Sequence, residues 1–303
     1  MVWLGERRGY LVDWVTQRWV QLTGTRVALE EAPWLRGPCG TTRMIGEGFF
    51  EAFAAEQGLS VRPLDERAGL IDGLAELAGP GFDASAVHPM IDEFYAHTAA
   101  FDLELRSRWS GPFRVLGWLI GRIFARRLAQ LNMPLDDDEL AGGVRSRIIQ
   151  LADDEGRVRH TGWVRTAVQT GRPVFVGQYG TDSIPGHEGP CIKVVFPLPN
   201  GNAIILLRPR VDEDGGLTLL SDGRRFGDPG FYFTVVADSG QVWARYVRTM
   251  KETLSLRAVE SGIRATHRFR VFGMPFVELR YTITPRPRAT DAQVVSGAQS
   301  TSS

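Results

Sequence analysis

The chain has 303 residues, of which 43% are hydrophobic, so it is long enough to form one large domain or two domains with a substantial core. Lysine and arginine together number 35, as do aspartate and glutamate, and the net charge of zero argues against nucleic acid as a partner. The two cysteines, Cys39 and Cys191, are too few for a disulfide framework and favour a reduced, cytoplasmic protein.

Residues 1–86 are expected to form an N-terminal helical, loop-rich region. No apolar segment follows the charges near the start, so no signal peptide is predicted, and no run of about 18 apolar residues predicts a transmembrane helix. Apolar residues at near-helical spacing predict helices over 10–22 and 44–57. Between them, Cys39 lies in a turn-rich segment. A reactive thiol is conceivable there, but no partner histidine is identifiable by spacing, which favours a structural turn.

Residues 88–133 are expected to be mainly helical. His88 followed by Pro89 is typical of a helix start. The clearest amphipathic pattern covers 113–131, where apolar residues recur at helical spacing and arginines occupy the other face. Such a helix either packs against the core with its arginines in water or makes a peripheral contact with a membrane surface. The first alternative is favoured.

From about Arg145 to Thr284 the sequence predicts a series of short strands, each ended by a turn signal. Pairs such as Asn200-Gly201 supply the positive φ that tight hairpins require. The expected strands cover 145–152, 156–168, 173–180, 190–198, 202–210, 216–220, 230–237, 241–248, 250–259, 262–273 and 275–284.

Strands joined by such short connections pair antiparallel. We therefore predict an α+β protein: the N-terminal helical part, and a C-terminal antiparallel β-sheet curved into a barrel-like cup. Residues 87–285 are expected to hold helices and this barrel-like domain. Residues 286–303 are small and polar, and they predict a disordered tail.

Several short stretches of this region occur in the same order as in a known family. They are Val87-His88-Pro89, Trp163-Val164-Arg165-Thr166, the segments 175–179, 197–200 and 216–221, and the segment from His267 to Ile283. Over roughly 87–284 this ordered set resembles the soluble part of the YndJ-like family of bacterial proteins. The resemblance implies a common fold but no reaction and no catalytic residue, because the family is uncharacterised. Members also carry a membrane-spanning part, which this chain is expected to lack.

Strand alternation predicts that four polar side chains share a face with apolar neighbours and point into one interior: Glu252, His160, His267 and Tyr281. Burying such groups without partners costs about 1–3 kcal/mol each, so they should bond to one another or line a wet cavity. A Glu and a His in an apolar pocket are suited to general acid–base chemistry. The alternative is that each is a structural core residue bonded to a neighbour.

Three function hypotheses follow. The first is a soluble binding protein for a hydrophobic small molecule, such as a lipid, isoprenoid or polyketide, held in the cup. The aromatic residues expected to contact this ligand are Tyr179, Phe231, Phe233, Tyr246 and Phe269. The second is a cofactor-independent cyclase or isomerase for a hydrophobic substrate, in which the four polar residues supply proton transfer. The third is a protein-interaction domain that uses an exposed apolar patch.

Two polar loops are further candidates, and no cofactor or metal is expected. In the loop 182–189, His187 and Glu188 are too few to bind a metal, which needs three or four convergent ligands. The loop 221–230 is rich in glycine and arginine and is able in principle to cradle an anion. It precedes no predicted helix and lacks a Walker-type lysine, so a surface loop is favoured.

Overall fold

The computed structural model describes residues 11–40, 46–109, 143–171 and 173–287. The helices of these ranges are α1 (Leu11–Thr23), α2 (Phe49–Gln57), α3 (Pro89–Ala96) and the short 3-10 helices Pro33–Leu35, Leu74–Leu77, Ala84–Ala86 and Thr98–Ala100. The helices expected from apolar spacing near 10–22 and after His88 are confirmed, and the one expected over 44–57 begins at Phe49. The helix predicted over 113–131 and most of the tail predicted over 286–303 lie outside the described residues.

The strands predicted from Arg145 onwards are confirmed. In chain order the strands are β1 (Thr25–Val27), β2 (Ser60–Val61), β3 (Phe101–Trp109), β4 (Val144–Ala152), β5 (Val158–Ala167), β6 (Pro173–Asp182), β7 (Cys191–Leu198), β8 (Gly201–Val211), β9 (Leu217–Leu220), β10 (Phe231–Val236), β11 (Val242–Tyr246), β12 (Met250–Val259), β13 (Gly262–Val271) and β14 (Met274–Pro285).

The expectation that 88–133 is mainly helical is wrong at β3. In this segment Phe101, Leu103 and Leu105 are buried and the residues between them are exposed. That alternation has a period of two, which is the pattern of a strand with one face on a core. β3 pairs antiparallel with β14, far along the chain, and becomes an end strand of the sheet.

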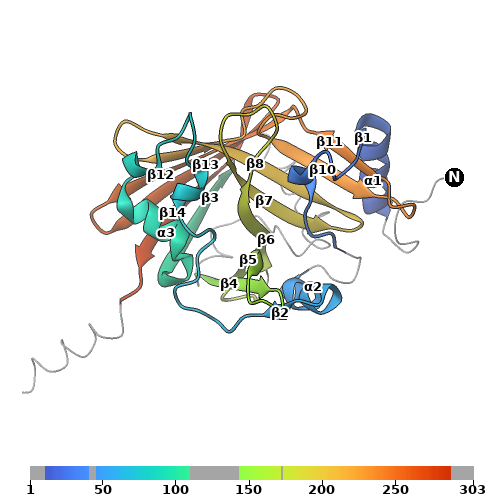
Figure 1. The fold of residues 1–303 in the computed structure, drawn as a ribbon. Coiled ribbons are helices and arrows are strands. Elements are labelled where there is room, and N and C mark those ends of the chain that lie inside the picture. Colours follow the sequence, from blue (N-terminus) through green and yellow to red (C-terminus); the bar gives the residue numbers. More distant parts are fainter. Residues whose placement is uncertain (1–10, 41–45, 110–142, 172, 288–303) are drawn as a thin grey trace, which may run out of the picture.

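The named strands form one sheet of 14 strands, and their pairings are antiparallel. The sheet divides at β8, whose first residues pair with β10 and whose last residues, Arg208–Val211, pair with β9. One arm then runs through β12, β13 and β14 to β3, and the other through β11 to β1 (Figure 1). Among the described residues no pairing joins β3 to β2 or β4, so the sheet is not closed into a barrel.

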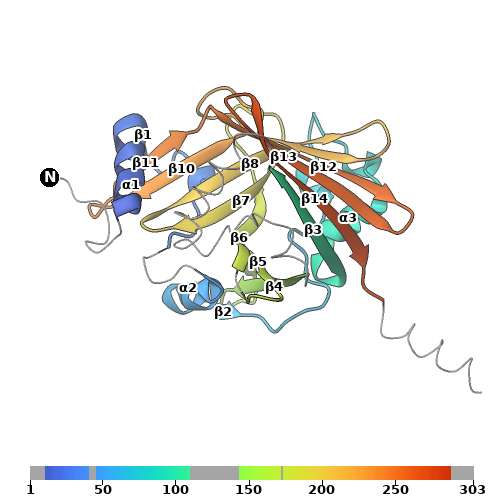
Figure 2. The ribbon, with the colours of Figure 1, turned by 180° about the vertical axis from the view of Figure 1, so that it is seen from behind.

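The main apolar core lies between strands from both ends of this sheet. It takes Leu103 and Leu279 from β3 and β14, Ile148 and Trp163 from β4 and β5, and Val194 from β7. Figure 2 shows β3 and β14 on one side and β4 to β8 on the other. The inward side chains of strands far apart in sequence therefore share one interior.

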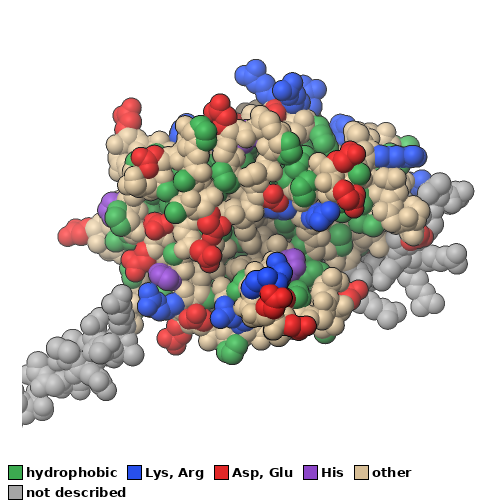
Figure 3. Space-filling model, in the orientation of Figure 1, with side chains coloured by type: hydrophobic (Ala, Val, Ile, Leu, Met, Phe, Trp, Pro, Cys, Tyr) green, Lys and Arg blue, Asp and Glu red, His purple; other side chains and the backbone are tan. Residues whose placement is uncertain are grey.

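The helices pack on different parts of the sheet, and α3 contributes Ile91, Phe94 and Tyr95 to the main core. Phe49, Phe50 and Phe53 of α2 pack on the outer face of β4, β5 and β6, and α3 lies against β12 and β13. α1 lies at the β10 and β11 end, where Val20 contacts Val235 (Figure 1). On the face shown in Figure 3, acidic and basic side chains are interspersed, in keeping with the net charge of zero.

Candidate functional site

A cavity of about 610 Å³ lies among the inward side chains of the sheet. Its volume is within the range of about 300–1,000 Å³ that is typical of small-molecule sites. Strands β3, β5 to β8, β10 and β12 to β14 each contribute to its walls, together with α1 and α3. Its aromatic lining includes Trp163, Phe175, Phe196, Phe231, Phe233 and Phe269. Every second side chain of a strand points to the same face of the sheet. The side chains on the cavity face are mostly aromatic or aliphatic, so the walls are largely apolar.

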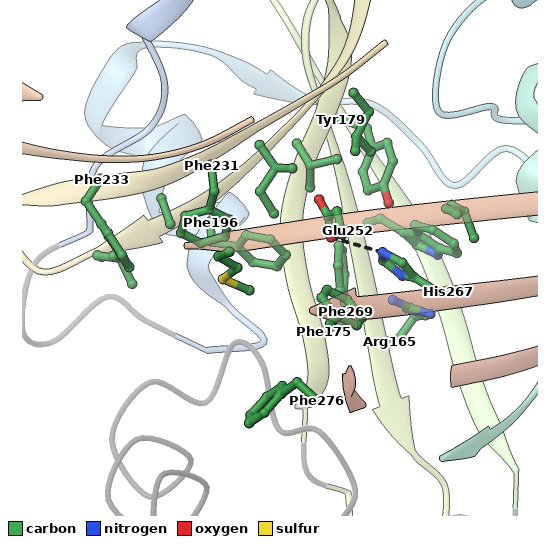
Figure 4. Close-up of a pocket in the computed structure, with 18 of the residues that line it drawn as sticks. Arg165, Phe175, Tyr179, Phe196, Phe231, Phe233, Glu252, His267, Phe269 and Phe276 are labelled. Atoms are coloured by element: carbon green, nitrogen blue, oxygen red, sulfur yellow. Dashed lines mark hydrogen bonds and ion pairs between the residues drawn. The ribbon is translucent and has the colours of Figure 1, made fainter. Parts of the chain in front are cut away.

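A carboxylate–imidazole pair lies in the wall of this cavity. The Nε2 atom of His267 is 2.9 Å from Oε2 of Glu252, and the Glu252 side chain is only 3% exposed (Figure 4). The two residues are diagonal neighbours on β12 and β13, because Glu252 is directly opposite Phe269. The second carboxylate oxygen, Oε1, is buried and has no hydrogen-bond partner among the described residues. This oxygen is therefore an available acceptor.

Arg165 is a buried cation in the same wall, with 7% of its surface exposed. Its guanidinium carbon lies 4.4 Å from the ring centre of Trp163, 4.3 Å from that of Phe175 and 5.7 Å from that of Tyr281. Desolvated cation–π contacts of this kind contribute about 2 kcal/mol. Within the described part of the chain, no hydrogen bond or ion pair engages this guanidinium, and its Nε is buried without a partner.

The hydroxyl of Tyr179 points toward the Glu252–His267 pair in Figure 4. Burial raises the pKa of Tyr179 above its ordinary value, although the nearby charge of Arg165 opposes this rise. The phenol is therefore neutral at physiological pH and can donate a hydrogen bond.

The cavity has two chemically different ends. In Figure 4 the polar groups of Arg165, Tyr179, Glu252 and His267 gather at one end, and Phe196, Phe231 and Phe233 lie at the other. The polar end offers a fixed cation, an acid–base pair and a hydroxyl. The aromatic end is mainly apolar, and Asp13, Thr16 and Gln17 of the neighbouring α1 also line the cavity. This arrangement suits a ligand with one polar group and an apolar body.

Three of the four polar residues predicted to face one interior line the cavity: Glu252, His267 and Tyr281. The prediction is wrong for His160, which lies on the opposite face of β5. There its Nδ1 is 2.9 Å from Oε1 of Gln178, and its ring centre is 5.2 Å from that of Phe53 in α2. β5 is buried on both faces from Thr161 onwards, so the apolar neighbours of His160 did not reveal which face was the interior.

Four of the five predicted ligand contacts also line the cavity: Tyr179, Phe231, Phe233 and Phe269. Tyr246 does not. It packs on the other face of β10 and β11 against Tyr232, with ring centres 5.0 Å apart, and its hydroxyl is 2.6 Å from the carbonyl oxygen of Gly223. β11 also has buried side chains at every second position, but that buried face belongs to a separate apolar cluster.

Arg165 was not among the predicted site residues. The available signal was its alternation with Trp163 and Ala167, which places an arginine in line with apolar residues on one face of a strand. An arginine in such a position is unusual, because buried arginines normally have an acidic partner.

The remaining candidates fit structural interpretations better. The carboxylate of Asp228 accepts the backbone N–H groups of Arg224 and Arg225, so the loop 221–230 is occupied by its own acid. Burial raises the pKa of Cys39 to about 11, which disfavours a reactive thiolate. Among the described residues, no group of three or more His, Cys, Asp or Glu side chains is placed to hold a metal. His187 therefore belongs to no such group.

Comparison with known proteins gives one informative similarity. Over 250 residues the chain is 28% identical to the "Uncharacterized membrane protein YndJ" of Bacillus subtilis (strain 168). The match covers 80% of this chain and 42% of that protein, so the chain spans less than half of its relative's length. No family model and no solved structure matches the chain. Within the described ranges, no helix is both long and apolar enough to cross a membrane. The resemblance indicated by the ordered motifs is confirmed.

Proposed function

We propose that this chain, a YndJ-like protein, binds a hydrophobic small molecule in a cup formed by its curved sheet. The observation that supports this proposal is the cavity of about 610 Å³ with its largely apolar walls. Protein interiors are normally packed without voids much larger than a water molecule. An apolar space of this size is therefore typical of a ligand site, in which the ligand supplies the missing contacts.

A reduced, cytoplasmic setting belongs to the same proposal. Its support is that Cys39 and Cys191 are both free thiols. The name of the relative, a membrane protein, fits a ligand of lipid or isoprenoid type, because such molecules partition into membranes.

The second candidate is a cofactor-independent cyclase or isomerase for a hydrophobic substrate. The Glu252–His267 pair favours it, because a buried carboxylate and an imidazole 2.9 Å apart can exchange protons with a bound molecule. Arg165 and Tyr179 would orient the substrate. If the protein only binds its ligand, a molecule incubated with it is recovered unchanged, whereas an isomerase or cyclase returns an isomer with the same mass and a different chromatographic retention.

Native mass spectrometry of the purified protein is the first test, followed by denaturation and analysis of released molecules in the lipid range. We expect an apolar molecule in stoichiometric amount. Where the protein is isolated empty, the neutral dye N-phenyl-1-naphthylamine is titrated into it, and saturable binding with increased fluorescence is expected.

The substitution Ala265→Phe tests whether this binding occurs in the cavity. Ala265 lies in the cavity wall and is 3% exposed, so a phenyl ring there projects into the space that the dye needs. We expect saturable dye binding to be lost. The matched control is Ala258→Phe, because Ala258 is half-buried on the adjacent strand and does not line the cavity. Equal dye affinity in both variants, or no saturable binding by the native protein, contradicts the proposal.

A further inference from the structure

We infer that the ligand carries a carboxylate that pairs with Arg165, while its apolar body lies among the aromatic side chains at the other end of the cavity. This inference rests on the proposed function and names the chemical class of its ligand.

The charge of Arg165 lacks an anionic partner among the described residues. A guanidinium is always protonated and has five N–H donors. The guanidinium of Arg165 is removed from bulk water, because only 7% of the surface of this residue is exposed. The described residues provide it with no oxygen acceptor and no ion pair. Buried charges in proteins are normally paired, because removal from water is costly for each ion.

The aromatic contacts of Arg165 do not satisfy the N–H donors of its guanidinium. Trp163 and Phe175 contact the cation through their ring faces, at 4.4 and 4.3 Å from ring centre to guanidinium carbon. Such contacts hold the guanidinium in one orientation and give its N–H groups no oxygen acceptor. A fixed, planar fork of donors matches the two oxygens of a carboxylate, which can accept two parallel hydrogen bonds.

Two acidic side chains also line the cavity, Glu252 on β12 and Asp13 on α1. The carboxylate of Glu252 would repel an anion placed against it, because His267 engages only one of its oxygens and Oε1 has no partner among the described residues. In the view of Figure 4 the imidazole is drawn between the carboxylate and the guanidinium. The ligand carboxylate is therefore expected at the guanidinium of Arg165 and not at Glu252. Tyr179 offers a neutral hydroxyl at the same end.

The other end of the cavity is mainly apolar. Phe196, Phe231 and Phe233 offer no charged group to a ligand, and the cavity is large enough for a drug-sized molecule. A molecule with a carboxylate at one end and a hydrocarbon body is complementary to both ends. A simple representative is a straight-chain fatty acid.

The test compares dodecanoate with dodecan-1-ol, which share a chain length and differ in the head group. Each is used to displace N-phenyl-1-naphthylamine from the 303-residue chain at neutral pH. We expect dodecanoate to bind about 10-fold or more tightly than the alcohol. We expect Arg165→Gln to weaken dodecanoate binding about 10- to 100-fold, the loss typical of a charged hydrogen-bond partner, and to leave the alcohol unaffected.

Two further variants keep the test decisive. Arg268→Gln is the matched control, because Arg268 is 53% exposed, pairs with Glu278 and does not line the cavity. Its dodecanoate affinity is expected to equal that of the native protein. Arg165→Lys retains the charge without the planar fork, and it replaces Arg165→Gln if that variant does not fold. An intermediate affinity for dodecanoate is expected of it.

The outcomes separate the inference from the proposed function. Equal affinity of the native protein for acid and alcohol, or an equal loss of both in the Arg165 variants, overturns the inference while the binding site stands. Failure of the native protein to bind dye, acid and alcohol overturns the proposed function itself.

Discussion

At the scale of single residues, burial of polar groups has different consequences at His160 and His267. His267 is bonded to a carboxylate in the cavity wall, whereas His160 is bonded to the neutral amide of Gln178 beneath α2. Burial lowers the pKa of His160 below its ordinary value, more strongly than its bond to Gln178 raises it. The folded protein therefore favours the neutral imidazole of His160.

This shift predicts how stability depends on pH. Because the pKa is lower in the folded than in the unfolded protein, the unfolded chain binds the proton more readily. The contribution of His160 is therefore fully present above the unfolded pKa of about 6.5 and is lost as pH falls through the lower, folded pKa. Urea denaturation at a series of pH values should show this loss, and His160→Gln should make the dependence shallower.

His187 should contribute to the same pH dependence, because burial also lowers its pKa. The single variant His160→Gln is expected to retain part of the pH dependence, and addition of His187→Gln should remove more of it. A pH dependence in His160→Gln equal to that of the native protein would show that His160 does not contribute.

The polar residues of β5, β12 and β13 were predictable from the sequence to different degrees. Alternation correctly placed Glu252 and His267 toward one interior, because the opposite faces of β12 and β13 are less apolar at these positions. It misplaced His160 and passed over Arg165, since β5 is buried on both faces and apolar neighbours flank every position. Which face of such a strand meets the cavity depends on α2, which comes from a distant part of the chain.

At the scale of elements, the position of α2 depends on one close approach to β5. Phe50 is fully buried, and a Cβ atom added at Gly162 would lie 2.5 Å from its ring. Gly162→Ala therefore forces the ring or the helix to move, and overpacking of this kind costs about 1–3 kcal/mol of unfolding free energy. The control is Gly180→Ala, because nothing lies within 4 Å of the added Cβ there.

A double-mutant cycle makes the reason for this loss testable. Phe50→Ala alone should cost about 3–5 kcal/mol, as is usual for a buried phenylalanine. In that background Gly162→Ala should cost much less than it does alone, because the clashing ring is gone. Additive losses of unfolding free energy in chemical denaturation would mean that Gly162 does not act through Phe50.

The elements themselves were predictable to different degrees. Turn residues separate β4 to β14, so these strands could be predicted one after another. The division of the sheet at β8 could not, because it depends on β10 and β9 pairing with different parts of one strand. β3 was missed because its three alternating apolar residues stand alone between helical patterns, and its partner β14 begins more than a hundred residues later in the chain.

At the scale of the whole molecule, the cavity links ligand binding to stability. Its walls include side chains from α1, from β5 to β8 and from β12 to β14, so unfolding dismantles the site completely. A ligand that binds only the folded protein stabilises it, by about 2.7 kcal/mol at a free concentration one hundred times its Kd.

This linkage gives the last prediction. Protein stripped of ligand should gain unfolding free energy when dodecanoate is added, and the gain should rise with the logarithm of concentration above Kd. Ala265→Phe occupies the cavity with its own side chain, so dodecanoate should leave its stability unchanged, while Ala258→Phe should respond as the native protein does. Thermal denaturation followed by circular dichroism measures all three proteins under one set of conditions. A gain shared equally by Ala265→Phe would mean that dodecanoate stabilises the fold from some other surface.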